Sequence, residues 1–298
     1  MLTNTIISTI IKNNTMKTFK LLLAIIIITS SLFSCSDDND DVIMDENPLA
    51  EFTMLTTLTA NSHAIEIYAE QDQFTVGYNE LSLRIKDNDT NSYISGAEVS
   101  WMPLMHMAEM QHSCPRSSVL QGEDDSVYTG FVIFQMAGNE TEYWEMTINY
   151  TIDGVEYSAS KELEVNMPSD NKRRVNVFTG SDDSRYILAM MPMEPEVAVN
   201  DFSAMLYKMD SMMAFSPIRD YGILIDPRMP SMGNHTSPNN VDLTYDEVSA
   251  MYTGKLSLTM TGYWVVNLQV LNATSEVLKG EEVTDENEAS SLFFEIEF

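Results

Sequence analysis

The feature that most constrains the fold of this chain is an internal repeat. The motif Tyr128-Thr129-Gly130 recurs as Tyr252-Thr253-Gly254, and a methionine and a glycine downstream recur at the same spacing of 124 residues (Met136 with Met260, Gly138 with Gly262). A tryptophan, Trp144 or Trp264, follows each copy. Self-similarity of this kind indicates two copies of one structural unit. A chain of 298 residues has room for two domains of ordinary size.

A second pair of similar segments lies upstream of these motifs. Residues 107–115 (MAEMQHSCP) parallel residues 229–238 (MPSMGNHTSP) if one residue is inserted. This alignment pairs Met107 with Met229, Met110 with Met232 and His112 with His235. We therefore expect the two copies to carry equivalent methionine- and histidine-containing segments.

Within each copy the hydrophobic pattern has the period of a β-strand. Leu81, Leu83 and Ile85 alternate with polar residues, residues 143–151 and 255–259 alternate similarly, and residues 264–270 form a β-branched run. No segment after residue 35 shows a convincing amphipathic helix. The sequence predicts an all-β protein of two tandem immunoglobulin-like sandwiches, at residues 51–167 and 174–298, joined by a short polar linker.

The repeated methionines and tryptophans have an ordinary structural interpretation within this fold. We expect Met136 and Met260 to lie inside strands and to pack in the core against Trp144 and Trp264. Trp101 is also expected in the core.

The first 34 residues have the features of a signal peptide. Lys17 and Lys20 precede an apolar run at residues 21–28, which is shorter than the roughly 20 residues that a membrane-spanning helix needs. Residues 32–35 (LFSC) resemble a bacterial lipobox, which implies cleavage before Cys35 and lipidation of its thiol. Residues 35–50 then form an acidic segment, interpreted either as a solvated tether or as resembling the export tag of Bacteroidetes-type surface lipoproteins. We expect a lipid-anchored protein of the cell envelope, at the outer membrane and exposed at the surface.

Charge and cysteine usage narrow the possible partners. The chain has 45 acidic and 16 basic residues, a net charge of −29, which disfavours binding to nucleic acid or to anionic lipid. The membrane is therefore expected as a partner through the lipid on Cys35. Of the two cysteines, Cys114 would then be left alone, without a partner for an intrachain disulfide.

Residues 101–114 contain methionines, histidines and a cysteine, which are side chains that can bind a metal ion. Thioether, imidazole and thiolate are together the ligands that soft copper(I) prefers. The first copy provides more of them, so we expect it to bind the metal more tightly. The alternative is that the methionines are packing or contact residues. The candidate metal ligands are Met105, His106, Met107, Met110, His112 and Cys114 in the first copy, and Met229, Met232 and His235 in the second.

These motifs resemble those of the YtkA-like/FixH-like family of extracytoplasmic domains. The resemblance rests on a strand leading to Met-Pro-x-Met-x-x-His (residues 229–235), then Tyr-x-Gly, a strand, and Gly-x-Trp (residues 262–264), and it extends over most of both copies. It implies a CopC-like β-sandwich and an association with copper handling or oxidase assembly, and it does not imply catalysis.

The sequence thus favours a non-enzymatic copper-binding protein for sequestration, relay or oxidase assembly, with a copper donor or acceptor protein as partner. The alternative is an adhesin-like surface interaction module without metal. The chain lacks a Gly-rich phosphate loop, an HExxH helix motif and a CxxC pair, so an enzyme is the least favoured class.

Overall fold

The computed structural model describes residues 47–298, which form one compact unit. The predicted signal peptide, Cys35 and the tether up to residue 46 lie outside the described residues. The predicted all-β class is confirmed: the described residues form strands and connections, with a single 3₁₀ turn, η1 (Pro230–Met232). None of the helical segments between residues 47 and 298 has the length and apolar character to cross a membrane.

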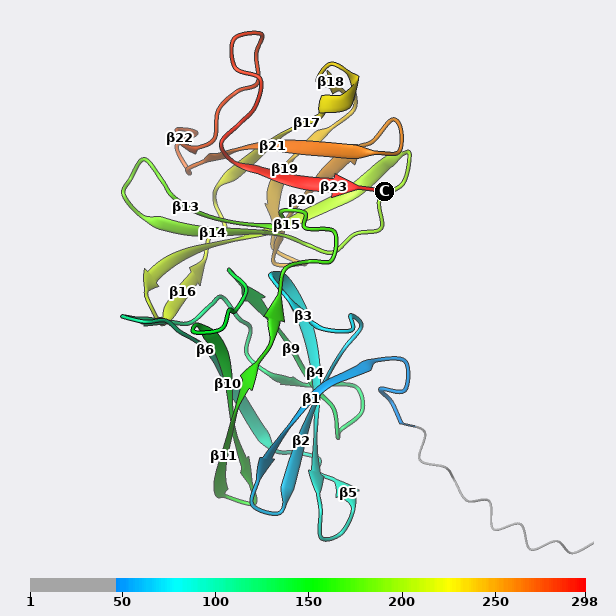
Figure 1. The fold of residues 1–298 in the computed structure, drawn as a ribbon, viewed down its shortest axis with the longest axis vertical. Helices are drawn as coiled ribbons and strands as arrows, with labels where there is room; N and C mark the ends of the chain where they lie inside the picture. Colours follow the sequence, from blue (N-terminus) through cyan, green and yellow to red (C-terminus); the bar gives the residue numbers. More distant parts are fainter. Residues whose placement is uncertain (1–46) are drawn as a thin grey trace, which may run out of the picture. The chain divides into compact units, whose positions relative to one another are not determined.

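The first half of the described chain is a β-sandwich of two antiparallel sheets (Figure 1). One sheet has the order β1 (Thr53–Ala60), β2 (His63–Ala69), β4 (Gly77–Asp87), β9 (Tyr128–Phe134), β8 (Leu120–Gln121), with β5 (Ser92–Tyr93) beside β4. The other has the order β11 (Val155–Leu163), β10 (Tyr143–Ile152), β6 (Glu98–His106), β7 (Gln111–His112). A parallel pair, β3 (Phe74–Thr75) with β12 (Val165–Asn166), completes this first sandwich.

The second half repeats this arrangement in one continuous sheet. The order is β13 (Val175–Thr179), β14 (Arg185–Met190), β15 (Val199–Ser211), β20 (Met251–Ser257), β19 (Val241–Asp246), β17 (Gly222–Met229), β21 (Tyr263–Leu271), β22 (Val277–Lys279). Three further strands pair beside this path, β16 (Ala214–Pro217), β18 (His235–Thr236) and β23 (Phe293–Glu297). Because β19 pairs with both β20 and β17, it joins the two layers that are separate sheets in the first sandwich.

Each half has its own hydrophobic core. Apolar residues of both layers pack together around Trp144 in the first sandwich and around Trp264 in the second, and both indoles are fully buried. The sheets of the two halves separate between β12 and β13. The predicted domain limits and the immunoglobulin-like subtype stay predictions, since contacts across this boundary keep residues 47–298 in one unit.

The tyrosine of the repeated Tyr-Thr-Gly motif makes an equivalent hydrogen bond in both sandwiches. The Tyr128 hydroxyl accepts a hydrogen bond from the Ala97 amide (2.8 Å), and the Tyr252 hydroxyl accepts one from the Tyr221 amide (3.3 Å). Each tyrosine is buried and so anchors the connection that leads into β6 or β17. The recurrence at a spacing of 124 residues therefore reflects an equivalent tertiary contact.

The strand predicted at residues 81–85 is confirmed, but it is buried on both faces and not on one. Leu81 and Leu83 belong to the core of the first sandwich, whereas Arg84 points to the other side. There the Arg84 guanidinium donates to Asn47 Oδ1 (2.9 Å) and Ser126 Oγ (3.0 Å). The segment preceding β1 thus covers a face that the alternating pattern predicted to be open to solvent.

A small apolar cluster and a hydrogen bond join the two sandwiches. The cluster combines residues of β4 and β9 with residues of β14, β15 and β16, around buried Ile133 and Ile187. In addition, the Ser113 amide donates to the Met212 carbonyl (2.7 Å), so the turn between β15 and β16 contacts the segment that follows β7. Both contacts bring the second sandwich against elements of the first.

The glycines of the Tyr-Thr-Gly motif lead to a test of the fold. A Cβ added at Gly254 would overlap the carbonyl oxygen of Val241 on the adjacent strand β19. We expect Gly254→Ala to lower the free energy of unfolding by about 1–3 kcal/mol, because backbone has to move. Gly222→Ala is the matched control, because its nearest neighbours lie at an ordinary 3.9 Å. Urea unfolding checks both variants; equal midpoints would contradict the close approach of β19.

Candidate metal centre

The methionine- and histidine-rich segment of the first sandwich is a hairpin formed by β6 and β7. Met105 lies opposite His112, and His106 lies opposite Gln111. Residues 107–110 form the turn, which the Met107 amide closes by donating to the Met110 carbonyl (3.0 Å). Side chains of directly opposed residues lie on the same face of an antiparallel pair, so Met105 and His112 share one face of this hairpin.

The second sandwich has an equivalent hairpin formed by β17 and β18. Met229 lies opposite His235, and Arg228 lies opposite Thr236. The 3₁₀ turn η1 joins the strands, and Gly233 follows it in the left-handed conformation (φ 66°) that reverses the chain. A cross-strand pair of one methionine and one histidine therefore occurs at both hairpins.

This register corrects the alignment expected from the sequence. The residue equivalent to Met229 is Met105 and not Met107, because Met105 and Met229 are the residues that pair with His112 and His235. Met105 and Met229 are 124 residues apart, the spacing of the Tyr-Thr-Gly motifs, and so are Pro103 and Pro227. The recurrence of Pro-x-Met at this spacing is the sequence signal that identifies the correct pair.

A buried tryptophan adjoins the first pair. Trp144 lies opposite Met105 on β10, and both side chains have no exposed surface. The imidazole of His112 meets the indole edge-on, with 5.5 Å between ring centroids and an interplanar angle of 88°. The indole Nε1 donates to the carbonyl of Met136 (2.9 Å). Thioether, imidazole and indole are thus neighbours at one end of the sandwich.

The hydrogen bonding of His112 fixes which ring nitrogen is free. Nδ1 lies 2.8 Å from the carbonyl oxygen of Ser113, which can only accept, so Nδ1 carries the proton in the neutral ring. The lone pair of Nε2 is then available. A carbonyl that holds the far ring nitrogen is the usual support of a metal-ligating histidine.

The second pair has similar neighbours in a more open setting. Met229 is buried, and its Cε lies 3.0 Å from the position that a Cβ on Gly262 would occupy. Trp264 is fully buried and donates to the Met260 carbonyl (3.0 Å). His235 is exposed, and the preceding Asn234 donates to the Glu288 carbonyl (2.9 Å) in the long connection between β22 and β23. This hydrogen bond therefore ties the second hairpin to that connection.

The remaining thioethers of the predicted set lie in the hairpin turns. Met107 is partly buried and packs against the core of the first sandwich. Met110 and Met232 are 48% and 56% exposed. The structure brings Met105 to His112 and Met229 to His235, and it leaves Met110 and Met232 projecting from the two turns.

His106 lies on the opposite face of the hairpin from Met105 and His112. Its ring stacks on Tyr143, with 4.8 Å between centroids and an interplanar angle of 11°. Gln111 Nε2 lies 2.8 Å from its Nδ1, and Glu145 Oε1 lies 3.6 Å from its Nε2. The structure therefore separates His106 from the ligands with which the sequence groups it.

Cys114 has no exposed surface and belongs to the core of the first sandwich. Burial raises the pKa of its thiol far above the ordinary value, although the charge of Arg116 opposes this shift. The group is consequently a neutral thiol at neutral pH, whereas metal binding requires the thiolate. This environment disfavours Cys114 as a ligand.

The candidate ligands at both hairpins are thioethers and imidazoles. Among residues 47–298, no three His, Cys, Asp or Glu side chains lie close enough together to hold a metal ion. Cys35, the predicted lipidation site, lies outside the described residues.

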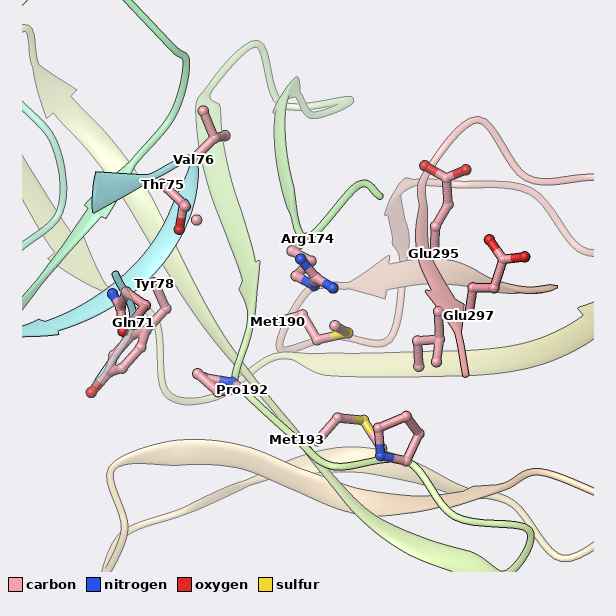
Figure 2. Close-up of a pocket in the computed structure, with 13 residues that line it drawn as sticks. Gln71, Thr75, Val76, Tyr78, Arg174, Met190, Pro192, Met193, Glu295 and Glu297 are labelled. Carbon is pink, nitrogen blue, oxygen red and sulfur yellow. The ribbon is translucent and has the colours of Figure 1, made fainter. Parts of the chain in front are cut away.

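A cavity of 260 Å³ is separate from the two hairpins (Figure 2). Its charged residues already have partners: Arg174 pairs with Asp170, and Lys172 Nζ lies 2.6 Å from Glu297 Oε2. The lining combines these charges with two thioethers and no imidazole. The residues labelled in Figure 2 are Gln71, Thr75, Val76, Tyr78, Arg174, Met190, Pro192, Met193, Glu295 and Glu297.

Comparison with known proteins adds little to this geometry. No protein-family model matches the chain, and no curated protein matches it. Among solved structures, it is similar to FdeC, an Escherichia coli adhesin, at 16% sequence identity over 75% of this chain and 64% of that chain, with a TM-score of 0.24. The chain thus spans less than two thirds of the solved FdeC chain.

The environment of Cys114 gives a prediction about its reactivity. We expect the native thiol to resist a maleimide reagent at about pH 8, near the ordinary thiol pKa, because it is buried and protonated. Adding urea should expose it and allow one label per chain lacking Cys35. Mass spectrometry with and without urea checks this expectation. Stoichiometric labelling of the folded protein would show that the thiol is accessible.

Proposed function

We propose that this protein is a non-enzymatic, lipid-anchored envelope protein that binds copper(I) at two equivalent hairpins. One observation carries the proposal: each sandwich places a methionine opposite a histidine at a hairpin (Met105 with His112, Met229 with His235). The recurrence of this pair in both halves of one chain is what a repeated binding site requires.

The ligand chemistry favours copper(I) over harder cations. Thioether sulfur binds soft ions, whereas magnesium and calcium require several oxygen ligands. A thioether also needs no deprotonation, so binding does not depend on thiolate formation. Because the Ser113 carbonyl accepts a hydrogen bond from Nδ1–H of His112, the lone pair on Nε2 can supply a nitrogen ligand.

The settings of the two sites support sequestration or relay. Met105 is fully buried, whereas His235 is exposed at the second hairpin. An exposed ligand allows exchange with a donor or acceptor protein, and a buried one slows the loss of the ion. The net charge of −29 would raise the local concentration of cations. Oxidase assembly is one use of the copper under this proposal.

An adhesin-like interaction module without metal is the second candidate. The observation that favours it is the exposure of Met110 and Met232 at the tips of the two hairpins. Exposed thioethers adapt to the shape of a partner, so methionine-rich tips also suit protein contact.

A competitive titration tests the first candidate. The fragment from Ser36 to Phe298 is titrated anaerobically with copper(I) against a chromophoric chelator. We expect two equivalents to bind. Met105→Leu with His112→Ala should abolish one of them, and Met229→Leu with His235→Ala should abolish the other, because each double change removes both members of one pair.

His106→Ala is the matched control, because this histidine belongs to the same hairpin but lies on the opposite face. It should retain both equivalents. A fragment that takes no copper from the chelator, or that binds equally well after both double changes, would contradict the copper function and favour the interaction module.

A further inference from the structure

Met136 and Met260 lie in connections and not in strands, contrary to the expectation from the sequence. Met136 follows the end of β9 at Phe134, and Met260 follows the end of β20 at Ser257. Both are partly buried and pack against the core of their own sandwich, next to the layer that contains the tryptophan. Their side chains are therefore at the border between core and solvent.

The backbone at these two positions is held at the candidate sites by the tryptophans. The Met136 carbonyl accepts from Trp144, the indole that lies opposite Met105 and edge-on to His112. The Met260 carbonyl accepts from Trp264 in the same way. A buried indole N–H has to find an acceptor, so these bonds fix each methionine beside its hairpin.

A second anchor holds each connection in the same place. The Gly138 amide donates to the Val165 carbonyl (3.0 Å), and the Gly262 amide donates to the Phe298 carbonyl (2.9 Å). Gly262 has φ 126°, and a Cβ on it would lie 3.0 Å from Cε of Met229. The connection that carries Met260 thus passes directly beside the thioether of Met229.

The spacing of the methionines distinguishes these two from those in the hairpin turns. Met136 and Met260 are 124 residues apart, as are Met105 and Met229. The hairpin turns differ in length by one residue, and their methionines do not align. Met136 and Met260 therefore recur at the same spacing as the hairpin methionines Met105 and Met229.

We propose that Met136 and Met260 supply a second thioether ligand to each copper site. This inference rests on the proposed copper function. The first site then consists of Met105, Met136 and His112, and the second of Met229, Met260 and His235. Two sulfurs and one nitrogen form a three-coordinate set, which suits copper(I). The turn methionines Met110 and Met232 are not part of either set.

The test measures the copper affinity of each site and the number of sulfur ligands per copper ion. The fragment from Ser36 to Phe298 is prepared as wild type and as Met136→Leu, Met260→Leu, Met110→Leu and Met232→Leu variants. Leucine keeps the volume of methionine and removes the sulfur, so each fold should persist, which urea unfolding verifies. We expect Met136→Leu and Met260→Leu each to weaken one site about tenfold or more. The two turn variants should keep both affinities within about twofold.

X-ray absorption at the copper edge gives a readout that a packing role would not move. The wild type should show two sulfurs and one nitrogen per copper, and the double variant Met136→Leu with Met260→Leu should show one sulfur fewer. Met146→Leu is the control for core packing, because Met146 is fully buried two residues beyond Trp144. It should leave the sulfur count unchanged.

The outcomes separate this inference from the proposed function. Two copper ions bound with one sulfur each, or affinities unchanged in the connection variants and reduced in the turn variants, would overturn the inference and leave copper binding intact. A wild-type fragment that binds no copper would overturn both.

Discussion

The buried indole N–H is the constraint on which the arrangement of both sandwiches depends. A tryptophan at the centre of the core excludes water from its ring, yet its N–H still needs an acceptor. In each sandwich the acceptor is the carbonyl of a methionine in the connection that precedes the tryptophan strand. That bond brings the connection over the end of the core. The hairpin that carries methionine opposite histidine belongs to the strand that pairs with the tryptophan strand, so this bond holds the connection near the candidate site.

The two hairpins are held by different hydrogen bonds to their surroundings. The first hairpin continues into Ser113, whose amide is bound by the Met212 carbonyl of the second sandwich. The second hairpin is bound instead through Asn234 by the connection between β22 and β23. In the first sandwich the strand corresponding to both β22 and β23 is the uninterrupted β11. Each hairpin is thus braced by a neighbour that the other lacks, which would make the copper affinities of the two proposed sites unequal.

Most of the fold could be predicted from the sequence, because strand periodicity is visible within short segments and the repeat is visible by comparing two segments. The strands at 143–151 and 264–270 follow directly from alternating or β-branched patterns. The face of β4 that carries Arg84 could not be predicted, because a segment distant in sequence covers it. The equivalence of Met107 and Met229 was wrong for a related reason. The alignment matched residue types and so paired Met107 with Met229. The equivalent residues are set instead by the pairing within each hairpin, and the first hairpin is one residue longer than the second.

The sequence by itself determined the all-β class, the duplication and the kinds of ligand present, because these depend on composition, period and spacing. It could not determine which side chains meet. Met105 and His106 are adjacent in the chain but lie on opposite faces, since successive residues of a strand alternate. Met105 and His112 are seven positions apart and lie face to face, since the turn between them has four residues. Only the tertiary structure, through register and through the bond that ties Met136 to Trp144, decided which residues lie close together.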